Sequence, residues 1–167
     1  MQTKIEQPYF PYSSPISLFE ELLFQFDWGY ERTSEHEITT ELEGRWCNYR
    51  LFAIWRQDLE SLMVSAIIDI KIPQGKRSSL ETLLSMMNPK MWLGHFEIPP
   101  DEELIAFRYN LTLRGNPSAT VEQIEEIIGS IITECDRFYP ALQFLLWGGK
   151  SPEDALMAAM LDTYGEA

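Results

Sequence analysis

The chain has 167 residues, of which 45% are hydrophobic, and this suits one domain that buries about two-thirds of its unfolded surface. Its 26 acidic and 13 basic residues give a net charge of −13, so nucleic acids and anionic membranes, which attract clusters of lysine and arginine, are not expected as partners. The chain shows no signal-peptide pattern and no apolar run near the roughly 20 residues of a membrane span. Its two cysteines lie in apolar segments, as reduced thiols do. The sequence therefore predicts a cytoplasmic protein.

A polar, proline-rich lead over residues 1–14 precedes a predicted helix over residues 17–29. The apolar residues of this helix recur at helical spacing, and Ser17 and Glu20 have the spacing of a capping box. We expect residues 1–14 to be flexible and residues 15–167 to form a single domain.

The rest of the chain changes its hydrophobic period several times, which indicates groups of strands separated by helices. The predicted elements are strands at residues 37–44, 45–57 and 61–73, a helix around 80–87, strands at 92–98 and 103–113, a long helix from Thr120 and a last helix from Pro152. Pro140 is predicted to kink or break the long helix, because proline removes a backbone hydrogen bond. The order α-β-β-β-α-β-β-α-α lacks regular β-α alternation and predicts an antiparallel α+β domain with helices packed on one sheet.

The segment at residues 148–151, "GGKS", looks like the end of a phosphate-binding loop. Such a loop requires its first glycine at position 144, which is occupied by Phe144. Gly148 and Gly149 instead suit the end of one helix, and Ser151 suits the cap of the next. The segment therefore predicts the junction between two helices and no nucleotide site.

Candidate catalytic and metal-binding side chains are few and isolated in the sequence: His36, His95, Cys47 and Cys135. None of them has the spacing of a metal site or of a Cys-His nucleophile, so no catalytic residue, metal or cofactor is predicted. The acidic residues early in the long helix favour its dipole and are interpreted as solvated: Glu122, Glu125 and Glu126. The alternative hypothesis is an unrecognised enzyme or small-ligand sensor with a pocket near His95.

Aromatic residues make up 13% of the chain, and most of them must lie in the core. A minority can form an exposed platform for a protein partner. The candidate partner-binding residues are Trp92, Phe96, Ile128 and Ile132. Because the long helix is apolar over more than a narrow stripe, we also predict a homodimer formed through this helix or through the sheet.

Four segments resemble the YbjN family of bacterial proteins, in its alphaproteobacterial-like branch: "GRWCNYRLFAIWRQ", "NPKMWLGHF", "FRYNLTLRG" and "ECDRFYPALQFLLWGGKSPEDALMAAMLDTYGEA". The resemblance runs from the first helix to the C-terminus. That family is similar in fold to type III secretion chaperones, small acidic α+β proteins that pair through their sheets and helices, and it is described as a group of sensory-transduction regulators. The resemblance implies this fold and a non-enzymatic protein-binding role, regulatory or chaperone-like, without any catalytic residue to carry over. The helix after Gly149 extends beyond the minimal chaperone arrangement.

Overall fold

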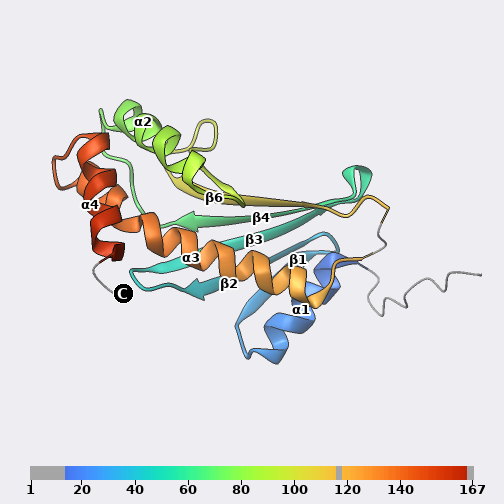
Figure 1. Cartoon of the computed structure of the whole chain (residues 1–167). Helices are drawn as coiled ribbons and strands as arrows, with labels where there is room; N and C mark the ends of the chain where they lie inside the picture. The colour runs from blue at the N-terminus through green and yellow to red at the C-terminus, as the bar shows by residue number, and fades with distance from the viewer. Residues whose placement is uncertain (1–13, 116–117, 165–167) are drawn as a thin grey trace, which may run out of the picture.

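The computed structural model describes residues 14–115 and 118–164 as a six-stranded antiparallel sheet with helices packed on one face (Figure 1). The strand order is β1-β2-β3-β4-β6-β5. The strands are β1 (Tyr30–Ser34), β2 (Glu37–Glu43), β3 (Asn48–Arg56), β4 (Ser61–Ile68), β5 (His95–Glu97) and β6 (Ile105–Thr112). The helices are α1 (Pro15–Gln25), α2 (Arg77–Met87), α3 (Val121–Leu146) and α4 (Pro152–Tyr164), with 3-10 turns at Gln57–Leu59 and Asn88–Lys90. The predicted antiparallel α+β class is confirmed. Of the predicted lead, only Ser14 lies within the described residues.

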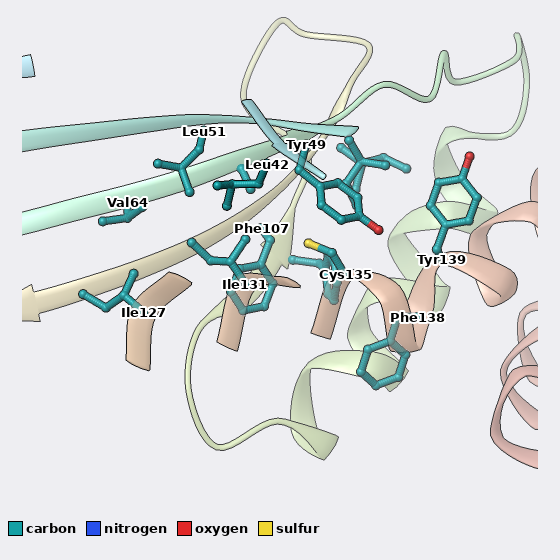
Figure 2. Close-up of a cluster of buried hydrophobic side chains, with 14 of the residues drawn as sticks. Leu42, Tyr49, Leu51, Val64, Phe107, Ile127, Ile131, Cys135, Phe138 and Tyr139 are labelled. Atoms are coloured by element: carbon teal, nitrogen blue, oxygen red, sulfur yellow. The ribbon is translucent and has the colours of Figure 1, made fainter. Parts of the chain in front are cut away.

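The core lies between the sheet and the helices. Leu51 pairs with Ala66, and Ala66 pairs with Phe107, so these side chains share one face of three adjacent strands. Figure 2 shows this face opposed to Ile127 and Ile131 of α3, and all five side chains are buried. Burial of this apolar surface fixes the helix layer on one side of the sheet. Among the helices of the described chain, none is long and apolar enough to cross a membrane.

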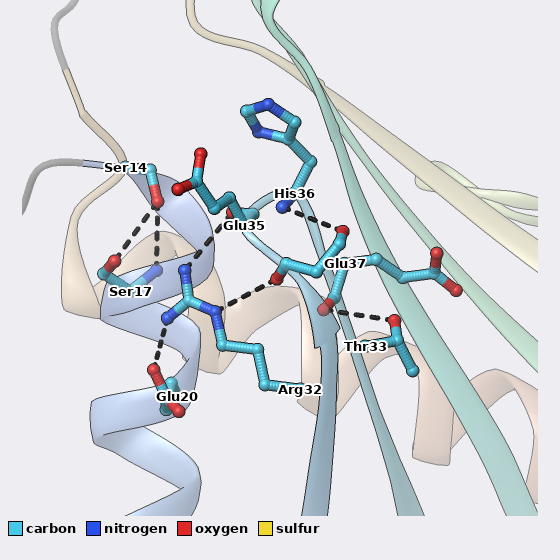
Figure 3. A network of polar contacts seen from close by, with 9 residues as sticks. Ser14, Ser17, Glu20, Arg32, Thr33, Glu35, His36 and Glu37 are labelled. Atoms are coloured by element: carbon cyan, nitrogen blue, oxygen red, sulfur yellow. Dashed lines mark hydrogen bonds and ion pairs between the residues drawn. The ribbon is translucent and has the colours of Figure 1, made fainter.

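Strand β1 is absent from the predicted elements, because its sequence, YERTS, has no apolar alternation. It forms the edge of the sheet through antiparallel pairing with β2. The register places Arg32 opposite Ile38, on the face toward α1, where Arg32 pairs with Glu20 and also donates to the Ser34 carbonyl at 3.1 Å (Figure 3). An inward-pointing charge on an edge strand stabilises its position and discourages pairing with other chains.

Helix α1 begins one residue after Ser14, earlier than predicted. The Ser14 hydroxyl accepts a hydrogen bond from the backbone N–H of Ser17 at 3.2 Å, and Pro15 occupies the first helical position. The predicted capping box of Ser17 and Glu20 is therefore wrong. Ser14 takes the cap because the ring of Pro15 already holds the backbone angle that starts a helix.

Of the kink or break predicted at Pro140, the break does not occur, because helix α3 runs from Val121 to Leu146 as one helix. Proline has no N–H to donate to the carbonyl of Asp136, four residues earlier. The indole Nε1 of Trp46 donates to that oxygen at 2.9 Å. A donor from the β2–β3 turn therefore replaces the hydrogen bond that the helix loses.

The start of α3 and the junction between α3 and α4 have the capping residues that the sequence predicts. Thr120 and Gln123 exchange two hydrogen bonds, of 2.9 and 3.2 Å, which confirms the capping box at the start of α3. Gly149 adopts a φ of +66°, and the Ser151 hydroxyl accepts from the N–H of Asp154 at 3.1 Å. The segment therefore ends one helix and caps the next, as its sequence predicts.

Candidate partner-binding site

A groove of about 730 Å³, open to solvent, separates the loop of residues 90–93 from the outer side of α3. Trp92 stands at the loop side of the groove with its side chain 100% exposed, and Leu93 beside it is 42% exposed. Tryptophan is enriched among the residues that contribute most to protein–protein binding, because its large ring gains much from burial. An open groove with such a rim suits a segment of another protein better than an enclosed small molecule.

The loop that carries Trp92 is closed by a pair of hydrogen bonds. The side chain of Asn88 donates to the carbonyl of Phe96 at 3.0 Å and accepts from the N–H of Phe96 at 2.8 Å. Gly94 has a φ of +72°, and a Cβ atom there would lie 2.3 Å from the ring of Phe107. The loop therefore requires glycine at this position, and a fixed frame presents Trp92 to solvent.

The wall formed by α3 is acidic. Glu122, Glu125, Glu126 and Glu134 line it, and Arg137 lies 3.3 Å from the carboxylate of Glu134. Hydrogen bonds to its own N–H and to Thr120 lower the pKa of Glu122. The glutamates at positions 122, 125 and 126 have no cation at ion-pair distance within the described residues, so this part of the wall carries uncompensated negative charge.

A second polar cluster surrounds Asp136, on the side of α3 that faces the β2–β3 turn. The Tyr49 hydroxyl donates to Oδ1 of Asp136 at 2.6 Å, and the backbone N–H of Arg45 donates to the same oxygen at 2.9 Å. Burial and the bond to Asp136 raise the pKa of Tyr49 far above its ordinary value of 10.0. The ring of Trp46 stacks on Tyr139 with a centroid distance of 6.3 Å. These contacts satisfy the carboxylate and tie the sheet to α3, which is a structural role.

The two cysteines are free thiols, and burial raises the pKa of each above its ordinary value of 9.0. Because the thiolate is the reactive form, a raised pKa disfavours nucleophilic chemistry. Cys47 also lines a second hollow of about 560 Å³, together with Arg50 and Asp69. Within the part of the chain that the structure describes, no three His, Cys, Asp or Glu side chains gather as a potential metal site.

The structure separates the four predicted partner-binding residues. Trp92 is fully exposed, whereas Phe96 and Ile128 lie in the core with exposed fractions of 2% and 6%. Ile132 is half-buried against the core. Phe96 and Ile128 are apolar because they pack between the sheet and the helices. In this conformation Trp92 can contact a partner directly, and Ile132 can do so in part.

His95, the centre of the alternative hypothesis, lies on the sheet face away from α3. Its Nε2 is 3.6 Å from Oε2 of Glu97, and Arg108 pairs with Oε1 of the same carboxylate at 2.6 Å. His95 lines neither of the two hollows described above. Its neighbours form an ion-pair cluster on the sheet surface.

Sequence reasoning missed the acidic wall as part of a site. The glutamates of α3 suit a helix dipole, and nothing in their spacing indicates that residues 90–93 pack nearby. The one signal is Gly129, which lines the groove in the middle of α3 although glycine is unfavourable inside a helix.

One comparison with known proteins, a family model, shows the family of this chain. The family described as "YbjN: Putative bacterial sensory transduction regulator" matches residues 15–144, which include the loop at 90–93 and most of α3. The chain is also similar to a solved structure, "Crystal structure of YbjN, a putative transcription regulator from E. coli", with 14% identity and a TM-score of 0.46 over 72% of this chain and 90% of that chain. No curated protein matches the sequence.

Proposed function

Because the chain belongs to the YbjN family, we propose that it is a non-enzymatic regulator that acts by binding another protein, in a regulatory or chaperone-like role. The observation that carries this proposal is the fully exposed Trp92 on a closed loop beside the groove. In this proposal Trp92 contacts the partner and the half-buried Ile132 does so in part, while Phe96 and Ile128 support the loop and the helix from behind.

Regulation through protein contacts fits the charge of the chain better than regulation through DNA. A net charge of −13 opposes the counterion release that gives DNA-binding proteins most of their affinity. We also propose a cytoplasmic location, which the two unpaired thiols, Cys47 and Cys135, support.

The test is affinity purification from the native host with the tagged parent chain and two tryptophan variants. Trp92→Ala should lose a partner that the parent retains, by roughly 30-fold if Trp92 is a residue worth about 2 kcal/mol. Trp147→Ala is the matched control, because Trp147 is also exposed, at 57%, but does not line the groove. Calorimetry with the purified partner then measures the affinity, and equal affinity for the parent and Trp92→Ala would refute the proposal.

We propose in addition that two copies pair through the sheet face that the described helices leave open. Phe52, Ile54, Met63 and Ile67 lie half-buried on this face of β3 and β4. Charges of both signs surround them: Glu41, Glu97, Arg50 and Arg108. An apolar stripe with mixed charges beside it supports pairing of the same surface with itself about a two-fold axis.

A further inference from the structure

We propose that the groove binds a segment of the partner protein in which lysine or arginine side chains accompany an apolar residue. This inference rests on the proposed function, since it names the chemistry of the partner at the same groove. It follows from the two walls, one apolar at Trp92 and Leu93, and one acidic along α3.

The acidic wall has a part that the helix itself does not explain. Glu122 lies in the first turn of α3, where the positive end of the helix dipole favours a carboxylate. Glu125 and Glu126 lie beyond that turn, are exposed, and lack a cation at ion-pair distance among the residues the structure describes. Like charges three or four residues apart destabilise a helix slightly. Cations of a bound segment would relieve this repulsion and gain attraction from all three glutamates.

The α3 wall of the groove also allows close approach. Gly129 lies one turn after Glu125 and Glu126, its φ is helical, and a Cβ atom there would have no heavy atom within 4 Å. No packing contact in the described chain therefore requires glycine, although glycine costs about 1 kcal/mol relative to alanine in a helix interior. Without a side chain, the helix backbone is open to a segment that lies across it.

The charges of the groove decide between the classes of occupant. Nucleic acid and anionic lipid would meet carboxylates and be repelled. A second copy of this chain carries 26 acidic against 13 basic residues and offers a poor complement. Two cations of the described chain line the groove. Arg137 is paired with Glu134, so Lys90 alone adds a positive charge against the acidic wall. A basic segment with an apolar residue matches both walls at once, and Trp92 also attracts arginine through its ring.

The experiment uses a defined probe, a synthetic peptide of arginine, leucine and serine, with a second peptide in which glutamate replaces arginine. The parent chain is labelled with 5-fluorotryptophan, and the Trp92 signal is assigned with Trp92→Phe. The basic peptide should shift the Trp92 signal, more weakly as salt is raised, whereas the acidic peptide should leave it unchanged. Failure of the basic peptide to bind, or equal binding of the acidic one, would overturn the inference.

Two sets of variants locate the binding. Combined Glu122→Gln, Glu125→Gln and Glu126→Gln should weaken the basic peptide roughly tenfold, the size expected for three exposed ion pairs. The matched control changes three exposed glutamates on β1, β2 and the turn between them: Glu31→Gln, Glu35→Gln and Glu43→Gln. The control removes the same charge at residues that do not line the groove and should leave the affinity within about twofold. If both sets of variants weaken binding equally, the peptide is attracted only by the net charge of the protein, and the groove is not its binding site.

Gly129→Leu supplies a second readout. Leucine has a better helix propensity than glycine, so the thermal midpoint should not fall, while the new side chain fills part of the groove beside α3 and abolishes peptide binding. Unchanged peptide affinity in this variant would contradict the site.

The proposed function and this inference can fail separately. If Trp92→Ala loses a native partner while the glutamine triple retains it, the protein-binding function stands and the basic segment is refuted. If light scattering finds that the glutamine triple dissociates a dimer of the parent, the occupant is a second copy, which also refutes the inference.

Discussion

Pro140 lies in the interior of α3, and the carbonyl that it leaves without an intrahelical donor is that of Asp136. The indole of Trp46 supplies a donor to this oxygen, while Tyr49 and the backbone of Arg45 bind the side chain of the same residue. The backbone carbonyl and the carboxylate of Asp136 therefore both accept hydrogen bonds from the β2–β3 turn and the start of β3. This one residue links the sheet to the middle of the long helix.

We predict that Trp46→Phe lowers the free energy of unfolding by about 1 kcal/mol, because phenylalanine keeps a ring beside Tyr139 but cannot donate a hydrogen bond. In the background of Pro140→Ala the cost should be smaller, since the alanine N–H can donate to the Asp136 carbonyl in its place. Urea unfolding of the four chains in this double-mutant cycle measures the coupling. Trp147→Phe, a change at an exposed tryptophan, should have little effect. An equal cost of Trp46→Phe in both backgrounds would show that the indole does not substitute for the lost bond.

Tyr49 gives a prediction with a pH dependence. Its hydroxyl donates to a carboxylate, so Tyr49→Phe should lower the free energy of unfolding at pH 7 by about 1.5–3 kcal/mol. The pKa of Tyr49 is raised from 10.0 in the folded state, so the neutral form stabilises the fold below pH 10, and this contribution is lost as pH rises above 10.

Urea unfolding at pH 7 and at several values above pH 10 tests this sign. The parent should lose stability more steeply than Tyr49→Phe, and the difference between them should shrink. Tyr109→Phe is the control for the hydrogen bond at pH 7, where it should cost less than Tyr49→Phe because the bond to Asp136 comes from Tyr49. The pKa of Tyr109 is also raised, so its contribution above pH 10 has the same sign. A gap between parent and variant that widens above pH 10 would contradict the assignment.

At the scale of elements, the sequence predicted the helices and strands whose hydrophobic residues recur at a regular spacing. Apolar alternation identified β2, β3, β4 and β6, and helical spacing identified α1, α2 and α3, since burial on one face imposes these periods. Helix α4 was predicted from its capping residues instead. The sequence prediction overran the end of β4, where Ile70 and Ile72 are buried after the strand has ended. It missed β1 because an edge strand is held by backbone pairing and by the ion pair of Arg32 with Glu20, which leave no apolar pattern.

The start of α4 carries a prediction about its cap. Ser151→Ala should lower the free energy of unfolding by about 1 kcal/mol, because the N–H of Asp154 loses the Ser151 oxygen. Ser130→Ala is the control, since Ser130 lies inside α3 and caps no helix, and it should stay within about 0.5 kcal/mol of the parent. Urea midpoints compare the two. An unchanged midpoint for Ser151→Ala would remove the cap assignment.

The neighbouring Lys150 provides a separate test of the rejected phosphate loop. Its ammonium lies 5.7 Å from the ring centroid of Phe144, and its backbone N–H donates to the carbonyl of the same residue at 3.1 Å. Both contacts belong to a helix end. Calorimetry should therefore detect no ATP binding by the parent or by Lys150→Ala, and ATP binding that the substitution abolishes would contradict this interpretation.

At the scale of the whole molecule, α3 separates the two proposed binding surfaces. Its inner side packs on the sheet, its outer side lines the groove, and the open sheet face lies on the far side of the strands. A protein segment in the groove and a second copy on the sheet therefore do not compete for space. The sequence named Trp92 as a candidate partner residue from the surplus of aromatic residues in the chain. The groove, however, requires the loop at 90–93 to meet residues 122–137 of α3, which no local pattern encodes.

The open sheet face gives the prediction for oligomeric state. Light scattering of the parent at about ten to a hundred micromolar should give twice the 19.4 kDa of one chain, in line with a weak to moderate interface. Ile54 and Met63 lie directly opposite each other in β3 and β4 and are half-buried, so Ile54→Glu with Met63→Glu should yield a folded monomer. Two charges at the centre of the stripe would stay hydrated in the monomer but lose their water in a dimer.

The matched control places the same charges on α3, as Ile128→Glu with Ile132→Glu. Ile128 is 6% exposed and Ile132 packs against the core, so this pair should abolish the folded signal in circular dichroism, because burying charge costs more than a small domain can sustain. If this double variant stays folded but no longer forms a dimer, the dimer interface lies on α3 and not on the sheet. A parent chain that scatters as 19.4 kDa would refute the dimer itself, while leaving the groove and its partner as a separate question for Trp92→Ala.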